Sequence, residues 1–343
     1  MTMTDVLDQG LSLKESGHLQ DAEILFRQAA EKLDGEQLWN IQFELALMLH
    51  DQHRVPEAAQ MYELVIKSEH EDLAPLSCFN LALMLQEAGR LDESEYFYRQ
   101  AIDSGHAEAA NAALNLARLY VRQGRFEEAE GLQRKGARSN NPGDRARSLV
   151  ALGSLLSGLQ RFAEAATVLE DAIAIDEPHS SASAAIALGI LNERQGNLEE
   201  AEAAFRTASQ SQDEEMESWA YVHLGLFLGG QGRTSEAETA YKKVLDLGDH
   251  QHVPYALFCL GTLMANEGEV KHAEDYFRRT ISTAHHKHAP AAMVNLGDLL
   301  FREEQFESAE ALWRQAVATG HPDYGPMARR NLQVLQRRGK HRR

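Results

Sequence analysis

The sequence predicts an all-α protein, a solenoid of about nine helix-turn-helix repeats followed by a C-terminal capping helix. The first observation is a small residue that recurs every 36 residues, with a single step of 35 between Ser94 and Ala129. The second is another small residue twelve positions earlier, and the third is a bulky residue four positions later. A motif at such a fixed period is typical of stacked helical units, because one unit cannot bury its apolar face alone.

The recurring small residue marks the second helix of each repeat. It stands at Ala22, Ala58, Ser94, Ala129, Ala165, Ala201, Ala237, Ala273 and Ala309. The earlier small residue marks the first helix, for example in Leu188-Gly189, and small residues at these points let the two helices approach closely. The bulky residues are expected to fill the space between one helix pair and the next; they are Phe26, Tyr62, Tyr98, Leu169, Phe205, Tyr241, Phe277 and Trp313.

Glycines between the two apolar patterns predict where the first helices end, because glycine adopts a left-handed conformation at little cost. They are Gly17, Gly89, Gly124, Gly196, Gly232 and Gly268. We expect nine repeats over residues 4–320, a capping helix over 323–338 and a basic tail over 339–343. The cap is indicated by an apolar stripe of Ala328, Leu332 and Leu335.

The fourth repeat departs most from the pattern. Gln133 stands where a bulky apolar residue is expected, and Gly131 and Gly136 fall inside its second helix. Glycine in a helix interior costs about 1 kcal/mol relative to alanine. We therefore expect a local softening or bend in this repeat.

Composition and charge narrow the function. The chain is 43% hydrophobic and 25% charged with eight prolines, which predicts an ordered protein. Its start lacks the basic and apolar segments of a signal peptide, and it has no run of eighteen apolar residues, so we predict a cytoplasmic protein without membrane contact. Cys78 and Cys259, 181 residues apart, are expected to be buried, reduced thiols.

The net charge of −18 disfavours general nucleic-acid binding and favours basic or apolar partners. Two segments differ. Residues 118–147 hold eight basic and four acidic side chains, and residues 329–343 hold seven basic and no acidic ones. The basic tail is expected to be solvated, with folding over the acidic body or nucleic-acid contact as alternatives.

No motif for catalysis, phosphate binding or metal binding is recognised, so neither an enzyme nor a cofactor is predicted. Histidines recur near the turn after the second helix, at His70, His106, His250, His286 and His321. A basic side chain suits a helix carboxyl end, and capping and turn formation are favoured over metal binding because the ligand spacing is loose.

The stretch LGILNERQGNLEEAEAAFRTA, from Leu188 to Ala208, resembles the tetratricopeptide repeat family, with some similarity to Sel1-like repeats. Repeats six to nine resemble it best, although the period is two residues longer than usual for the family. The resemblance implies a right-handed superhelix whose first helices line a concave groove that binds peptides or partner proteins.

Two rows of residues project onto that groove. The first row lies three residues before the small residue of each first helix, is apolar and includes Phe43 and Phe79. Packing between adjacent helices is the alternative reading of this row. The second row lies one residue after the small residue and is Leu11, Leu47, Leu83, Arg118, Ser154, Ile190, Leu226, Thr262 and Asp298. Its apolar members predict that repeats one to three, and again six and seven, accept an apolar segment such as an amphipathic helix.

Polar groove positions suggest what else a ligand carries. Asn80, Asn115 and Asn295 resemble the asparagine ladder by which some family members hold an extended peptide backbone. A candidate pocket for a carboxylate or phosphate consists of Arg118, Arg122 and Arg147 with Asn111 and Asn115. A solvated or internally paired face is the alternative.

The function predicted from the sequence is a scaffold that holds a protein or peptide ligand, amphipathic or extended, with an acidic group as one option. The alternative is a self-associating structural protein that forms a homo-oligomer, and an unrecognised enzyme is the third class. The sequence does not identify the partner.

Overall fold

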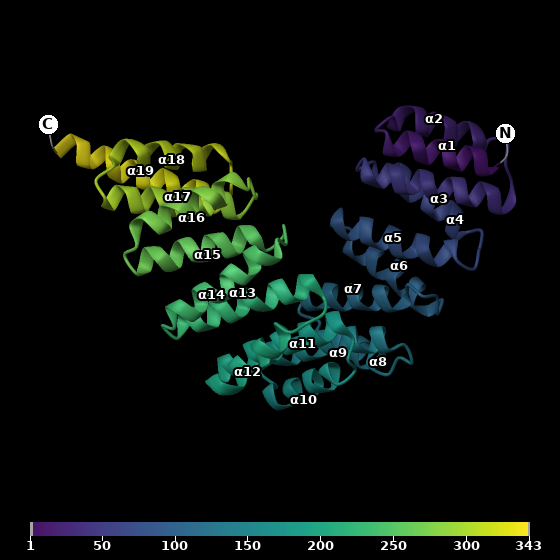
Figure 1. Ribbon diagram of the computed structural model, residues 1–343. Coiled ribbons are helices and arrows are strands. Elements are labelled where there is room, and N and C mark those ends of the chain that lie inside the picture. The colour runs from purple at the N-terminus through teal and green to yellow at the C-terminus, as the bar shows by residue number, and fades with distance from the viewer. Residues whose placement is uncertain (1–2, 342–343) are drawn as a thin grey trace. The chain divides into compact units, whose positions relative to one another are not determined.

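A computed structural model describes residues 3–341, which form nineteen helices and no strand (Figure 1). The predicted all-α class, a solenoid of helix-turn-helix repeats, is confirmed. Each odd-numbered helix from α1 to α17 is the first helix of a hairpin, and the helix after it is the second. The helices are α1 (Met3–Glu15), α2 (Leu19–Ala30), α3 (Gly35–Asp51), α4 (Val55–Ile66), α5 (Leu73–Glu87), α6 (Leu91–Asp103), α7 (Ala109–Arg122), α8 (Phe126–Gly136), α9 (Pro142–Gly158), α10 (Phe162–Ile173), α11 (Pro178–Gln195), α12 (Leu198–Ala208), α13 (Glu214–Gly230), α14 (Thr234–Leu247), α15 (Val253–Asn266), α16 (Val270–Ser282), α17 (His288–Arg302), α18 (Phe306–Ala318) and α19 (Tyr324–His341).

The chain divides into two compact units, residues 1–155 (unit 1) and 156–343 (unit 2), with the division inside α9. Unit 1 has an apolar core in which Phe26, Tyr62 and Leu81 are fully buried. Unit 2 has core clusters around Tyr241 and around Trp313. Helices that follow one another in sequence pack together within each unit, which is the expected contact pattern of stacked hairpins.

The small residue of the first helix and the bulky residue of the second meet inside one hairpin. A Cβ atom added to Gly225 would lie 2.6 Å from the ring of Tyr241, and one added to Gly261 would lie 2.7 Å from Phe277. The bulky ring therefore packs against the glycine of its own hairpin, which adds to its expected role between hairpins. The same contact recurs at Gly10–Phe26, Gly189–Phe205 and Gly297–Trp313.

The turn that ends each first helix is left-handed, as the glycine positions predict. All six predicted glycines have positive φ, for example 77° at Gly17 and 81° at Gly196. Repeats without glycine keep the same backbone, because His53, Gln160 and Glu304 adopt φ of 58°, 62° and 59° at the equivalent position. Left-handed conformation is costly for these residues, so repeat packing overrides their local preference.

The histidines take part in the turns, as predicted, but the predicted capping of the preceding helix is wrong. Their ring nitrogens accept hydrogen bonds at the start of the next helix and do not cap the end of the preceding one. Nδ1 of His70 accepts from the backbone N–H groups of Asp72 and Leu73, both at 3.2 Å. His106, His285 and His321 do the same, whereas His286 stacks on His285 and His250 is exposed. A neutral imidazole nitrogen is an acceptor for the free donors of a helix start, which is why the role is reversed.

One of the two glycines in helix α8 of repeat four, Gly136, is explained by helix packing. A Cβ atom on Gly136 would lie 2.2 Å from Oγ of Ser148, so glycine permits a close approach of α8 to α9. Gln133 is buried in the bulky position, and Gly131 is exposed with open space beside it. Helix α8 is continuous across Gly131 and ends at Gly136, and the softening expected here stays a prediction.

Ion pairs join some neighbouring second helices. Arg125, at the start of α8, contacts Glu95 of α6 at 2.6 Å and also pairs with Glu128. The hydrogen bond from Arg125 lowers the pKa of Glu95 to about 2. Arg233 bridges Glu202 of α12 and Glu236 in the same way.

The last helix occupies the predicted cap position and is longer than expected. Ala328 of α19 is buried in the terminal core cluster, and Leu332 and Leu335 pack against that cluster. The helix extends to His341, three residues beyond the predicted end at 338, so it includes the first part of the expected basic tail. Residues 342 and 343 of that tail lie outside the described residues.

Both cysteines are buried with free thiols, as predicted. Burial raises the pKa of Cys78 to about 11 and that of Cys259 to about 12. Across residues 3–341, every helix is too short or too polar to span a bilayer.

Candidate functional site

In unit 1 the candidate site is the face formed by the first helices, where α3 contacts both α1 and α5. The first predicted row serves mainly for packing on this face. Phe43 meets the ring of Tyr62 edge-on at 6.2 Å, and Phe79 lies 6.2 Å from Tyr98. Both phenylalanines keep part of their surface exposed. Other members of the row, such as Leu114, are buried.

The second row is accessible in both units. In unit 1, Leu47 and Leu83 are partly exposed and Arg118 is exposed. In unit 2, Ile190 on α11 is partly exposed and Leu226 on α13 is 40% exposed. Position in the repeat therefore separates an inner packing row from an outer row that a ligand can reach.

Charged side chains beside the second row form a ladder between adjacent first helices in unit 1. Lys14 of α1 pairs with Asp51 of α3 at 3.5 Å, and His50 of α3 contacts Glu87 of α5 at 3.5 Å. At the equivalent positions of the next helix pair, α5 carries Gln86 in place of Lys14 or His50. Helix α7 carries Arg122 in place of the acidic Asp51 or Glu87. The ladder thus stops at α7 with an unmatched guanidinium group.

Arg118 and Arg122 lie one turn apart on α7, and both are exposed. Among residues 3–341, neither has an acidic side chain within ion-pair distance. Arg118 follows Leu11, Leu47 and Leu83 in the second row. The apolar row of unit 1 therefore leads to two exposed arginine side chains, Arg118 and Arg122, which have no acidic partner among residues 3–341.

Arg147 on α9 is placed differently. It pairs with Asp144 at 2.5 Å and donates to Oδ1 of Asn111 at 2.7 Å. Asn111 precedes Arg118 by seven residues, or about 10 Å along α7. The structure therefore does not bring all three predicted arginines together, and the open pair is Arg118 and Arg122.

The polar positions two residues before the small residue are partly exposed. Asn80 and Asn115 lie there on α5 and α7, and Asn295 occupies the position on α17 in unit 2. Glu44 takes the place on α3, where burial raises its pKa. His223 takes it on α13. Amides therefore occupy this position on α5 and α7 of unit 1 and on α17 of unit 2, and the first helices do not carry a continuous asparagine ladder.

Unit 2 has an aromatic surface that the sequence reasoning missed. Trp219 on α13 meets His223 edge-on at 4.5 Å, and Tyr255 on α15 stacks on His288 at 4.8 Å. Burial lowers the pKa of both His223 and His288 to about 4. Repeat position could have revealed this surface. Trp219 and Tyr255 lie six residues before the small residue of their first helix, as the predicted groove residue Asn111 does in unit 1.

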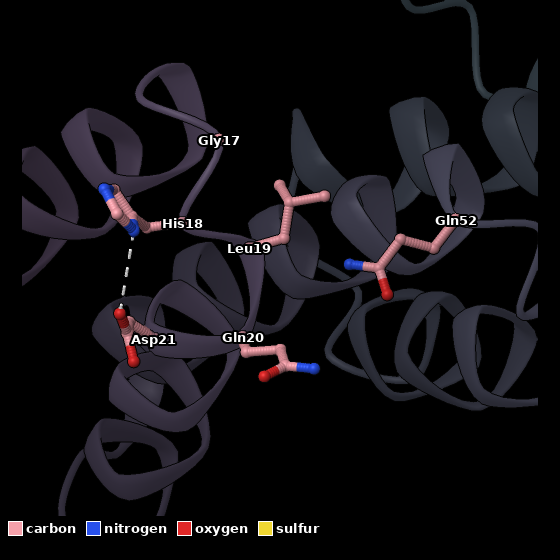
Figure 2. A pocket seen from close by; sticks show the side chains of 6 residues that line it. All are labelled: Gly17, His18, Leu19, Gln20, Asp21 and Gln52. Atoms are coloured by element: carbon pink, nitrogen blue, oxygen red, sulfur yellow. Dashed lines mark ion pairs between the residues drawn. The ribbon is translucent and has the colours of Figure 1, made fainter.

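A hollow of about 470 Å³ lies beside the turn of the first hairpin, bordered by residues 17–21 and Gln52 (Figure 2). His18 and Asp21 are 4.0 Å apart at its edge. Its charged groups face each other, so they provide no convergent ligand contact. Among the described residues, no group of three His, Cys, Asp or Glu side chains has an arrangement that would hold a metal ion.

Comparison with known families gives one consistent result. Four family models described as tetratricopeptide repeat match the chain. One matches residues 7–76 and 150–214, a second 71–140, a third 220–247 and a fourth 291–320. No curated protein matches.

Solved structures are similar at low sequence identity. A tetratricopeptide repeat protein from Parabacteroides merdae ATCC 43184 is 19% identical, with a TM-score of 0.51 over 79% of this chain and 98% of that one. Yeast Tom70 is 13% identical, with a TM-score of 0.63 over 93% of this chain and 64% of Tom70. At these identities the likeness shows the fold alone.

Proposed function

The chain belongs to the tetratricopeptide repeat family, and on that premise we propose that unit 1 binds a peptide segment of a partner protein. The binding face is the one formed by α1, α3, α5 and α7. The observation that carries the proposal is the partly exposed row Leu11, Leu47 and Leu83, which leads to the open cations Arg118 and Arg122. This order calls for a segment with apolar side chains followed by an acidic group.

Each part of the face has a role in binding. The leucine row removes apolar ligand surface from water, at about 25 cal/mol per Å². An arginine offers a planar fork of donors to a carboxylate or phosphate. Such a contact contributes about 1.5–3 kcal/mol when desolvated and under about 1 kcal/mol when exposed. Phe43, Asn80 and Asn115 border the same face and complete the set of groove residues in unit 1.

The proposal describes a cytoplasmic, non-catalytic scaffold without a cofactor. It includes nine repeats over residues 4–320 and a cap that begins at residue 323. The exposed Leu226, with Ile190, marks the corresponding face of unit 2 as a second apolar surface, and Asn295 supplies an amide on the first helix α17 of that unit.

Self-association end to end is disfavoured by the first hairpin. In α3, Ile41 and Leu45 are buried in the core of unit 1. The equivalent residues of α1, 36 positions earlier, are Asp5 and Gln9, and both are exposed. A polar outer face is what a terminal repeat needs for solubility, and it gives another copy little apolar surface to pack on.

Site-specific photo-crosslinking from the face tests the proposal. We expect a benzophenone amino acid at Leu83 to capture a partner polypeptide in cells of the source organism. The same group at Tyr96, which is 58% exposed on the second helix α6, is the matched control. Equal capture from both positions, or capture only from Tyr96, would show that the first-helix face is not the binding surface.

A further inference from the structure

Helix α19 takes the place that a first helix would occupy in a tenth repeat. Asn331 and Val334 of α19 follow Asn295 and Asp298 of α17 by 36 residues each, and α19 contacts both α17 and α18. Val334 is 53% exposed and Met327 is 43% exposed. An exposed face of α19 therefore carries apolar side chains.

A hollow of about 260 Å³ opens beside this face. It is lined by Asp298, Phe301, Arg302, Trp313, Asn331 and Val334. Oδ1 of Asp298 accepts from Nε1 of Trp313 at 3.1 Å and from Nδ2 of Asn331 at 2.6 Å. These bonds join α17 to α18 and α19, so the Asp298 carboxylate already accepts hydrogen bonds within the protein. Burial also raises the pKa of Asp298.

Three arginine side chains around the hollow are exposed to solvent. Arg302 lies on its edge, and Arg330 and Arg337 lie within about one turn of Val334 on α19; all three are exposed. Among the described residues, none of these three has an acidic partner within ion-pair distance. Arg338 differs, because it contacts Glu304 at 3.5 Å and lies over the rings of Phe301 and Phe306.

We propose that the hollow between α17 and α19 is a second binding site, which takes an acidic polypeptide segment with one apolar side chain. The apolar side chain enters the hollow against Phe301 and Val334, and flanking carboxylates meet Arg302 and Arg330. Charge complementarity supports this occupant, because residues 329–343 hold seven basic and no acidic side chains. The site is separate from the proposed face of unit 1.

A protein segment is favoured over an anionic bilayer as the occupant. Peripheral membrane helices carry a broad apolar face with aromatic and leucine side chains. Among the residues of α19 up to Arg338, whose side chains the structure describes, Met327 and Val334 are the large apolar groups that are exposed. One side chain fills a hollow of this size, whereas two separated apolar groups give weak support to insertion.

The test uses the full chain, labelled with nitrogen-15, and three acetylated pentapeptide amides, EELEE, QQLQQ and EEAEE. The readout is the indole N–H signal of Trp313, which lines the hollow. We expect EELEE to shift this signal with a millimolar or lower Kd. QQLQQ and EEAEE should each bind at least tenfold more weakly, because one lacks the charges and the other the apolar side chain.

Protein variants separate charge recognition from folding. Arg302→Ala combined with Arg330→Ala should weaken EELEE binding at least tenfold with unchanged helicity. Arg314→Ala is the matched control, because Arg314 is exposed on α18 but paired with Glu310 at 2.6 Å, and it should leave binding unaltered. Equal binding of QQLQQ, or no shift of the Trp313 signal by EELEE, overturns the proposal. So does a shift produced by phosphatidylserine vesicles but not by EELEE, which would assign the surface to lipid.

Discussion

The two units present different chemistry on the same element of the repeat. In unit 1 the first helices carry charged side chains beside the leucine row, with the pair Lys14–Asp51 and the open Arg118 and Arg122. In unit 2, α15 has no Asp, Glu, Lys or Arg, and α13 has none from Ser218 to Gly230. Trp219, His223 and Leu226 stand there instead.

This difference shows how a repeat separates stability from binding. The packing positions are similar in both units, and a glycine faces a bulky ring in the first hairpin of unit 1 and in four hairpins of unit 2. The outer positions bear little of the packing and are free to vary, so each unit can suit a different ligand. An apolar segment with an acidic group matches unit 1, and an apolar or aromatic segment matches the face of α13 and α15 in unit 2.

The largest expected effect tests whether the two units share one packing rule. Gly225→Ala in unit 2 should lower the free energy of unfolding by about 1–3 kcal/mol, because the new Cβ atom would lie 2.6 Å from the Tyr241 ring. The measurement is urea denaturation of the full chain.

The matched change in unit 1 is Ala82→Gly, at the equivalent position opposite Tyr98. It introduces no overlap and should cost about 1 kcal/mol through helix propensity alone. If Gly225→Ala leaves the free energy of unfolding unchanged, then the close contact between Gly225 and the Tyr241 ring does not require glycine at this position of unit 2.

A smaller effect concerns the histidines of unit 2. The pKa of His223 is lowered by burial to about 4, below its ordinary 6.5. The unfolded chain therefore takes up a proton between pH 6.5 and 4 that the folded chain does not. Stability contributed by the neutral ring is complete above pH 6.5 and is lost as pH falls toward 4.

The expected loss from His223 is about 1–2 kcal/mol between pH 7 and 5. His223→Asn, which places there the amide found at Asn80 and Asn115, should reduce the acid sensitivity by that amount. Urea denaturation at the two pH values measures it. An identical pH dependence in the variant would mean that the His223 ring is not held neutral by the fold.

The smallest effect lies in the turns, which both units share. His53 has φ of 58° where the next repeat has Gly89. His53→Gly should stabilise unit 1 by about 0.5–1 kcal/mol by relieving the left-handed conformation. Gly89→Ala should destabilise it by a similar amount. A loss of stability in His53→Gly would show that the histidine ring contributes more than the strain costs.

The sequence predicted the fold well because packing repeats. The 36-residue recurrence located the hairpins, and the turn glycines located the ends of six first helices. It misassigned the turn histidines, because periodicity gives a residue's position but not whether its ring accepts or donates a hydrogen bond. Nδ1 of His70 is an acceptor, which only the three-dimensional turn reveals.

The candidate site was predicted in part. The second row was found because it keeps a fixed distance from the small residue. Arg147 was predicted to project to the groove with Arg118 and Arg122, but its pairing with Asn111 depends on the neighbouring helix and is not visible in a linear pattern. Trp219 and Tyr255 were missed because their position was considered only for Asn111 and Arg147 and was not followed as a row into unit 2.

The most direct test of the central claim is titration of the partner segment captured at Leu83 against the variant Arg118→Ala/Arg122→Ala. We predict at least tenfold weaker binding and a flatter salt dependence, because two charged contacts are removed while helicity is kept. Arg147→Ala is the control and should change affinity much less, since Arg147 is paired within the protein. Unaltered affinity with the salt dependence of the wild type would contradict the account and leave Arg118 and Arg122 as ordinary solvated side chains.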